Sequence, residues 1–329
     1  MHRRWPGLRS IGCALPLILT AQCDQPLPCQ NGAAESSGNL SPGPVFQDST
    51  DPFTIGDRTV RCIDVQRCQD GAPVPLLIHT PQEPGDYPVV VFQHGFLARN
   101  SQYDVILTHL ASHGFVVIAA QMYEPGLSPL IGQPSAAQEA ELAASVLDWL
   151  PANLSRLAGV SARTDLLGLA GHSRGGRVVW RVLATDSSRA KAVAGVDPAD
   201  GDPLPFGDPT RVIHGPFHFS LPSLIIGAGV TGACARTEIN HEQFYAASAS
   251  PAWHVVATDY GHVDMLDEDA VETNALYCGA GSTRREPMRR LVAGLLTAFF
   301  RGALQDDPGA FSILTAADAA PARITTESK

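Results

Sequence analysis

Short apolar runs alternate with amphipathic stretches through the middle of the chain. The runs are rich in Val, Ile, Leu and Ala, and their length suits buried parallel strands. The stretches between them place apolar residues three or four positions apart, which is the period of a helix packed on a core. Strands are predicted at Thr59–Val65, Pro75–His79, Pro88–Gln93, Phe115–Gln121, Asp165–Ala170, Lys191–Val196, Pro222–Gly227 and Trp253–Asp259, and helices at Gln102–His113, Ala136–Leu157, Gly175–Leu183, Asn240–Ala247 and Arg285–Leu304.

This alternation predicts an α/β fold, in which a mostly parallel central sheet is covered by helices on both faces. The first two strands are expected to pair antiparallel. One folded domain is expected over residues 58–304. Residues 22–57, rich in Pro, Ser and Gly, are expected to form a flexible arm, and the tail 305–329 is expected to be only partly ordered.

The N-terminus has the pattern of an export signal. A basic start, an apolar core at 11–20 and small residues after it predict a signal peptide over residues 1–21. The apolar core is too short to span a bilayer. Cys23 allows two outcomes, a lipoprotein tethered to a membrane through an acylated cysteine or a freely secreted form. The protein is therefore expected to be exported, whether secreted, periplasmic or attached to the cell envelope.

The charge of the chain limits the classes of partner that it can bind, and its cysteine content indicates an oxidising environment. The net charge of −10, without a basic cluster beyond the N-terminus, argues against binding to nucleic acid. Loss of the signal peptide leaves six of the seven cysteines, and six cysteines in an exported chain suggest three disulfides. The predicted pairs are Cys62–Cys68 and Cys234–Cys278, with Cys23–Cys29 as a third pair if Cys23 carries no lipid.

No metal or cofactor is predicted. The segment Gly227–Gly232 matches the dinucleotide pattern GxGxxG, but it comes late in the sheet and no uninterrupted helix follows it. His241-Glu242 lacks the second histidine of a zinc-protease helix, and the cysteine spacings contain no CxxC zinc pair.

One hexapeptide carries the strongest chemical signal. Gly171-His172-Ser173-Arg174-Gly175-Gly176 follows a predicted strand and precedes a predicted helix. A serine between glycines at such a junction is the nucleophile elbow of an α/β-hydrolase. Ser173 is therefore the predicted nucleophile of a serine hydrolase.

A nucleophilic serine requires a histidine as its base and an acid that orients the histidine. Candidates for both directly follow predicted strands that come after Ser173 in the chain. His262 follows the last predicted strand and is the predicted base, while His172, His241 and His254 occupy positions better suited to packing or capping. Asp197 directly follows the strand after the elbow helix and is the predicted acid, with Asp200 as the alternative. The order of serine, acid and histidine along the chain is the order used by this architecture.

Two backbone amides are candidates for an oxyanion hole. His94-Gly95 ends the predicted strand before Phe96, at the position where hydrolases of this architecture supply one donor. The amide of Phe96 is the predicted first donor, and the amide of Arg174 is the predicted second. The later segment 202–221 could flank an apolar groove as a small lid or could simply connect two strands, and its candidate substrate-binding residues are Phe206, Phe217 and Phe219.

At these residues the chain resembles the plant chlorophyllases, members of the α/β-hydrolase superfamily. The resemblance covers roughly residues 75–303, and it rests on a run of motifs in order rather than on one. The matching motifs are His94-Gly95-Phe96, Asn100-Ser101, Ser112–Phe115, Gln121-Met122-Tyr123, Gly171–Gly176, Gly195–Gly201, Asn240–Glu242 with Phe244, Pro251–His254, Asp259–Leu266, Tyr277-Cys278 and Pro287–Arg290.

The resemblance implies hydrolysis of the phytyl ester of chlorophyll to chlorophyllide and phytol, by a triad of Ser173, Asp197 and His262 and without a metal. Tyr123, within a matched motif, joins the substrate-binding candidates. The exported, cysteine-bearing arm departs from the plant pattern, so another ester with a long apolar group is an open possibility. Two alternatives remain, a cutinase-like polyester or lipid esterase and a non-catalytic binding protein on a hydrolase fold.

Overall fold

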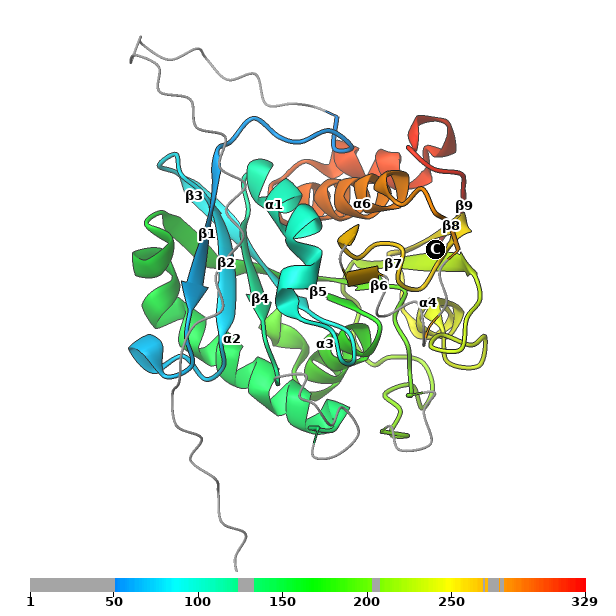
Figure 1. Cartoon of the computed structure of the whole chain (residues 1–329), viewed down its shortest axis with the longest axis horizontal. Helices are drawn as coiled ribbons and strands as arrows, with labels where there is room; N and C mark the ends of the chain where they lie inside the picture. Colours follow the sequence, from blue (N-terminus) through cyan, green and yellow to red (C-terminus); the bar gives the residue numbers. More distant parts are fainter. Residues whose placement is uncertain (1–50, 124–132, 203–207, 269, 272–277, 279–280) are drawn as a thin grey trace, which may run out of the picture.

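The computed structural model describes residues 51–123, 133–202, 208–268, 270–271, 278 and 281–329. Within these residues, nine strands form one sheet in the order β1-β2-β4-β3-β5-β6-β7-β8-β9. In Figure 1, β1 and β2 lie at one end of the sheet and β8 and β9 at the other. The strands are β1 (Val60–Val65), β2 (Leu76–Pro81), β3 (Asp86–Gln93), β4 (Val116–Ala120), β5 (Ser161–His172), β6 (Ala192–Val196), β7 (Ser223–Val230), β8 (Ala252–Gly261) and β9 (Ile324–Ser328).

The sheet is mostly parallel. Six consecutive strands of the sheet, β4, β3, β5, β6, β7 and β8, pair parallel to one another. β1 pairs antiparallel to β2, and β2 pairs antiparallel to β4. The predicted α/β fold class is therefore confirmed, and the sheet has the arrangement of an α/β-hydrolase.

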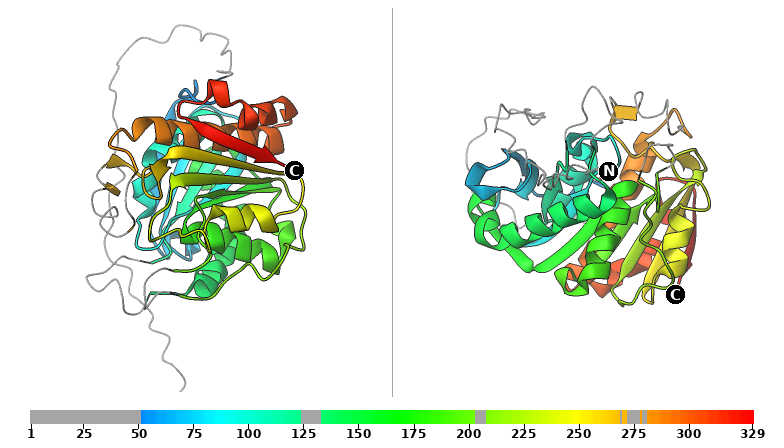
Figure 2. Two further views of the ribbon diagram at one scale, coloured as in Figure 1. Left: turned by 90° about the vertical axis from the view of Figure 1, so that its right-hand side faces the viewer. Right: turned by 90° about the horizontal axis from the view of Figure 1, so that it is seen from below.

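Helices cover both faces of the sheet, as the left-hand view of Figure 2 shows. One core packs α1 (Asp104–Ser112) and α6 (Glu286–Leu304) onto one face. The other core packs α2 (Ala136–Ala158), α3 (Arg174–Thr185) and α4 (His241–Ala247) onto the opposite face. Alternate strand residues enter alternate cores, because successive side chains of a strand point to opposite faces.

Local signals fix the ends of the longest helix. Ser135 caps α2 by accepting the amide of Gln138, and the Gln138 side chain accepts the amide of Ser135 in return. Gly159 ends the helix at φ 62°, a left-handed conformation that glycine adopts without steric cost. α2 thus returns the chain to the start of β5, the strand that leads to Ser173.

Two expectations about the ends of the folded domain are wrong. The tail forms the 3-10 helices η4 (Pro308–Thr315) and η5 (Ala317–Ala319) and then β9, which pairs antiparallel to β8. Phe311 stacks on Trp253 with ring centroids 4.6 Å apart and packs, partly buried, against the core, so an aromatic contact orders the tail. At the other end, Phe53 is buried against α6, so the last residues of the expected flexible arm belong to the core.

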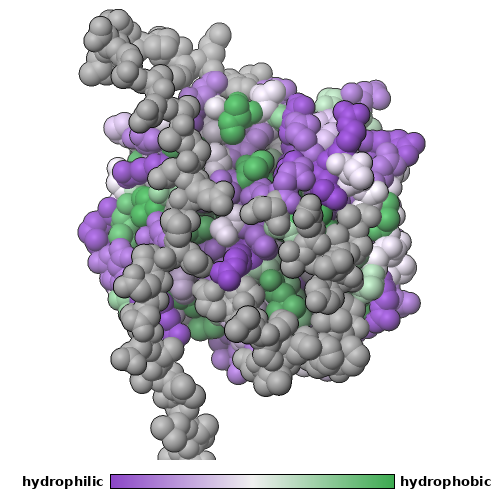
Figure 3. All heavy atoms as spheres, viewed as in Figure 1, coloured by the Kyte–Doolittle hydropathy of each residue, from purple (hydrophilic) through white to green (hydrophobic). Residues whose placement is uncertain are grey.

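The molecular surface is mixed in polarity. On the face shown in Figure 3, apolar residues (green) are scattered among hydrophilic ones (purple). In the part of the chain that the structure describes, no helix combines the length and the apolar character that crossing a bilayer requires.

Candidate active site

The backbone around Ser173 turns sharply from strand to helix. β5 ends at His172 and α3 begins at Arg174, and Ser173 between them has φ 56° and ψ −123°. Such a strained conformation in a residue with a side chain is typical of the nucleophile elbow. A Cβ on Gly171 would lie 2.4 Å from the carbonyl oxygen of Gly175. A Cβ on Gly175 would lie 2.2 Å from the carbonyl oxygen of Gln93, at the end of β3. Both glycines are therefore needed for the turn.

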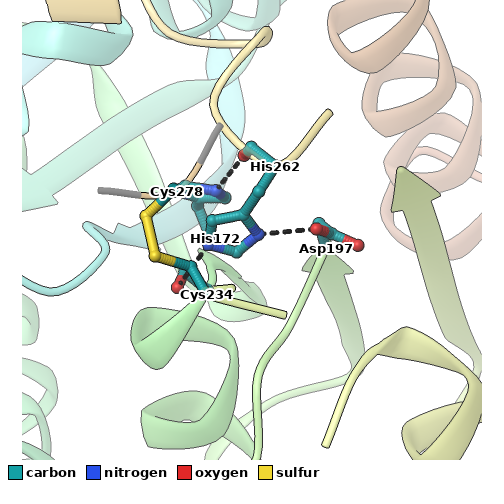
Figure 4. The surroundings of a disulfide bond; sticks show 6 residues. His172, Asp197, Cys234, His262 and Cys278 are labelled. Atoms are coloured by element: carbon teal, nitrogen blue, oxygen red, sulfur yellow. Dashed lines mark hydrogen bonds and ion pairs between the residues drawn. A yellow bond between two sulfur atoms is a disulfide. The ribbon is translucent and has the colours of Figure 1, made fainter. Parts of the chain in front are cut away.

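Ser173, His262 and Asp197 form one hydrogen-bonded chain. Oγ of Ser173 lies 2.8 Å from Nε2 of His262, and Nδ1 of His262 lies 2.6 Å from Oδ2 of Asp197. Each residue directly follows the carboxyl end of a strand, β5, β8 and β6 respectively. Figure 4 shows Asp197 and His262 reaching toward each other from separate elements. The structure therefore brings together the three residues that the sequence predicts for the triad.

The surroundings of Asp197 keep its carboxylate ionised. Burial by itself would raise the pKa of Asp197, but the hydrogen bond and charge of His262 oppose burial, as do the charge of His241 and the amide of Ala228. Together they hold the pKa of Asp197 below its ordinary value. Nε2 of His241 lies 3.9 Å from Oδ1 of Asp197, and the Ala228 amide donates to the same oxygen over 3.0 Å. An ionised Asp197 accepts Nδ1–H of His262 and directs the lone pair of Nε2 toward Ser173.

The alternative acid, Asp200, has a different role in the structure. Its two carboxylate oxygens accept the amides of Val212 and Ile213, at 2.7 and 3.1 Å. Asp200 therefore anchors the segment that follows β6, while the hydrogen bond to His262 belongs to Asp197.

The turn after β3 presents one amide suited to the predicted oxyanion hole. The Gly95 amide donates to the hydroxyl of Tyr103 over 3.0 Å, and the Leu97 amide donates to the hydroxyl of Tyr123 over 2.8 Å. Among the described residues, no acceptor lies within hydrogen-bond distance of the Phe96 amide between them. Phe96 also lines the cavity beside the elbow, so its amide is available to an oxygen bound there.

The side chain of Arg174 connects the two predicted amide donors. Its guanidinium lies over the Phe96 ring, 3.9 Å from the centroid, and it pairs with the buried carboxylates of Glu139, at 2.8 Å, and Asp202. Burial alone would lower the pKa of Arg174, but Asp202 and Glu139 raise it. Burial raises the pKa of Glu139 to about 7, against the attraction of Arg174. Arg174, the residue after the predicted nucleophile, is thereby held against the loop that carries the other predicted donor.

Arg174→Ala is expected to lower the free energy of unfolding by about 3–5 kcal/mol, because the variant leaves the buried Glu139 without its cation and leaves Asp202 with Arg177 as its remaining cation. Urea denaturation followed by circular dichroism measures the loss. Arg163→Ala is the matched control, since its partner Asp165 is exposed and the pair is solvated. Equal stability of the Arg174 and parent proteins would show that the buried ion pairs contribute nothing net.

His172 and Tyr103 link the turn after β3 to the loop that carries His262. Nε2–H of His172 donates to the carbonyl of His262 over 2.9 Å, and the Tyr103 hydroxyl lies 2.8 Å from Nδ1 of His172. Burial, followed by the charge of His262, lowers the pKa of His172 to about 3, so this imidazole is neutral. From the sequence, His172 is considered only as an alternative to His262 as the base. Tyr103 carries no sequence signal, because its contact with His172 joins residues 69 positions apart.

Asp264 supports the same loop from its other side. It is fully buried, and its Oδ2 accepts the amides of Gly261, Gly281 and Ser282 at 2.8 to 3.0 Å. Oδ1 accepts Nε–H of Arg285 over 3.2 Å. No role is predicted for Asp264 from the sequence, although it lies two residues after His262.

A cavity of about 60 Å³ adjoins Ser173. His172 and His262 form its polar side. The Cys234–Cys278 disulfide, predicted from the sequence, is present and forms part of the wall, as Figure 4 shows beside His262. The apolar part of the lining is Phe96, Leu97, Ala98, Val263 and Leu266.

The predicted Cys62–Cys68 disulfide is wrong, because the structure has both residues as thiols. Cys62 lies within β1, and the extended strand carries Val65 about 10 Å farther on before the chain turns. Cys68 lies beyond the end of β1, next to the 3-10 helix η1 (Gln69–Gly71), while Cys62 stays within the strand, opposite His79 of β2. The third predicted pair, Cys23–Cys29, lies outside the described residues.

The predicted substrate-binding residues do not gather at this cavity. Phe217 and Phe219 stack on each other with centroids 5.4 Å apart, and Phe217 packs near Trp180 in the core under α3. Tyr123 supports the Leu97 amide rather than lining the cavity. Phe206, in the segment considered as a lid, lies outside the described residues.

Comparison with known proteins identifies the family. The sequence profile of the Chlorophyllase family matches residues 48–329. Chlorophyllase-2 of Arabidopsis thaliana is 35% identical over 276 residues, which are 76% of this chain and 85% of that protein. Chlorophyllase-1, chloroplastic, of Citrus unshiu is 35% identical over 80% of this chain and 84% of its own length. Chlorophyllase type 0 of Chenopodium album is 33% identical over 85% of this chain and 86% of its own length. The protein is a carboxylic-ester hydrolase and belongs to the chlorophyllase family.

Proposed function

We propose that the protein hydrolyses esters of long apolar alcohols through an acyl-enzyme intermediate, with chlorophyll as the leading substrate. Ser173 is the nucleophile, His262 the general base and Asp197 the residue that orients the base. The observation that carries the proposal is the continuous chain from Ser173 Oγ through His262 to Asp197, at 2.8 and 2.6 Å, on a strained elbow.

The proposed reaction proceeds in two steps that share one base. Nε2 of His262 takes the hydroxyl proton of Ser173 as Oγ attacks the ester carbonyl, and the amides of Phe96 and Arg174 stabilise the oxyanion. His262 then gives the proton to the alcohol oxygen, the alcohol leaves, and an acyl ester remains on Ser173. Water, deprotonated by His262, attacks this ester, and His262 gives the proton to Oγ of Ser173 as the acid leaves.

The apolar wall of the cavity and the names of the relatives support the substrate class. Leu97, Val263 and Leu266 line the space next to Ser173. Burying alkyl surface against this wall contributes about 0.8 kcal/mol per methylene, and the cavity of about 60 Å³ takes only the part of an apolar alcohol next to the ester. The relatives are named chlorophyllases.

Chlorophyll a and the methyl ester of chlorophyllide a differ only in the alcohol, so comparing them isolates the proposed apolar recognition. Chlorophyll a is expected to have a kcat/KM at least about tenfold higher, which corresponds to about 1.4 kcal/mol. Chlorophyllide release, measured by chromatography on the purified protein, gives both rates.

The same measurement extended to other esters separates the alternatives. p-Nitrophenyl esters of graded chain length report general esterase activity, and an aliphatic polyester reports cutinase-like activity. Turnover of the polyester without turnover of chlorophyll would replace the proposal with a cutinase-like function. Absence of turnover on every ester would favour a binding protein on a hydrolase fold.

A further inference from the structure

A second cluster of reactive side chains lies at the end of the sheet farthest from β9. Cys62 on β1 and His79 on β2 are direct partners in the antiparallel register. Asp104 begins α1, which packs against both strands, and Figure 1 shows the three elements side by side. The cysteine sulfur, one imidazole nitrogen and one carboxylate oxygen all lie within 4.8 Å of one another.

We propose that Cys62, His79 and Asp104 bind a zinc ion. A thiolate, an imidazole and a carboxylate are the ligands that Zn²⁺ uses in proteins, and a thiolate disfavours Mg²⁺ and Ca²⁺. The site is separate from the elbow, since its ligands come from β1, β2 and α1 while Ser173 follows β5.

The spacing of the three side chains suits a tetrahedral ion. Nε2 of His79 lies 3.9 Å from Sγ of Cys62 and 3.6 Å from Oδ1 of Asp104. Zinc bonds of about 2.3 Å to sulfur and about 2.0–2.2 Å to nitrogen and oxygen place tetrahedral ligands about 3.3–3.6 Å apart. The two separations from His79 exceed these values by about 0.3 Å, and all three ligand atoms lie within 4.8 Å of one another, so side-chain rotation of the partly exposed Asp104 has to bring its carboxylate toward Cys62.

A neighbouring hydroxyl orients the imidazole for this role. Oγ1 of Thr108 lies 3.3 Å from Nδ1 of His79 and can accept its N–H, which leaves the lone pair on Nε2, the nitrogen nearest Cys62 and Asp104. A partner on the far nitrogen is the usual way in which proteins orient a metal-binding histidine.

Charge and access also fit the ion. The thiolate and the carboxylate together neutralise Zn²⁺, and binding releases the thiol proton of Cys62 to solvent. The His79 side chain is fully buried, whereas the Asp104 side chain is 41% exposed. The ion therefore enters from the side of Asp104, where water completes the fourth position.

Cobalt titration of the purified full chain, after removal of bound metal with a chelator, tests the site. Co²⁺ takes the same tetrahedral ligands as Zn²⁺ and gives a thiolate-to-metal absorption band when sulfur coordinates it. One Co²⁺ per chain is expected to develop this band, and Zn²⁺ is expected to abolish it by displacement. Cys62→Ser should lose the band, and Asp104→Asn should weaken Co²⁺ binding at least tenfold.

Cys68→Ser is the matched control, because it removes an exposed thiol from the same region and leaves the proposed ligands intact. It should bind Co²⁺ like the parent. Zn²⁺ should raise the Tm of the parent and of Cys68→Ser but not the Tm of Cys62→Ser. If Cys62→Ser fails to fold, Asp104→Asn, altered at a partly exposed side chain, decides the question. A parent protein without the band, or a band lost in Cys68→Ser and kept in Cys62→Ser, would overturn the proposal.

Discussion

Ser173→Ala is expected to lower kcat for ester hydrolysis by on the order of 10⁶-fold, because it removes the attacking oxygen 2.8 Å from Nε2 of His262. The variant should also lose labelling by a fluorophosphonate, which forms its covalent bond with an activated serine. Hydrolysis of a p-nitrophenyl ester and intact mass after labelling measure the two effects. Folding should be unaffected, since alanine occupies no more space than serine at this turn.

Ser145→Ala is the control for this experiment. Ser145 is exposed on α2, and its hydroxyl bonds only to the helix carbonyl of Glu141, at 3.0 Å. This variant should keep parental activity and labelling. Full activity in Ser173→Ala would show that another residue attacks the ester and would remove the nucleophile assignment.

Asp197→Asn is expected to lower kcat by on the order of 10⁴-fold with little change in KM. Asparagine can donate to Nδ1 of His262, which selects the tautomer whose Nε2 carries a proton and cannot accept one from Ser173. The loss should appear in kcat because the aspartate acts on the base rather than on substrate binding. Steady-state kinetics on a soluble ester measure both constants.

Asp200→Asn separates the two candidate acids. Asp200 accepts only backbone amides among the described residues, so its amide variant should lose stability while keeping kcat within about tenfold of the parent. The opposite ranking of the two variants would move the acid to Asp200.

The pH dependence of stability follows from the same carboxylate. The folded-state pKa of Asp197 lies below its ordinary value, so the ionised group stabilises the fold above the unfolded-state pKa of about 3.9. That contribution disappears as the pH falls through the lower folded-state pKa. Asp197 therefore stays ionised at mildly acidic and neutral pH, as the proposed role of His262 as a base requires.

Much of the fold could be predicted because its signals are local. The buried strand β3 is continuous in Val and Phe from 89 to 92, and α2 carries its own cap and its own terminal glycine. The tail was harder to predict. β9 is an edge strand with three exposed residues among its five, and its pattern alone does not distinguish it from a loop. Pairing with β8 and the stacking of Phe311 on Trp253 order this segment.

Part of the site was equally local. Ser173 between glycines, Asp197 at the end of β6 and His262 at the end of β8 each follow a strand, and parallel strands bring their carboxyl ends to one edge. The supporting groups carry no such signal. Tyr103 contacts His172 across 69 residues, and Asp264 collects amides from two separate segments of the chain.

By itself, the sequence determined the order of strands and helices from β1 to α6, the elbow at Ser173 and the residues able to serve it as acid and base. These features depend on neighbours within a few positions, where steric limits, hydrophobic period and backbone hydrogen bonding act directly. Only the tertiary structure decided which carboxylate forms a hydrogen bond with His262 and which cysteines form a disulfide. It also decided that, of the amides of Gly95, Phe96 and Leu97, the Phe96 amide is the one without a hydrogen-bond acceptor among the described residues. It also placed Cys62 opposite His79 and beside Asp104. Such contacts join distant parts of the chain, and they exist only once the sheet register and helix packing are set.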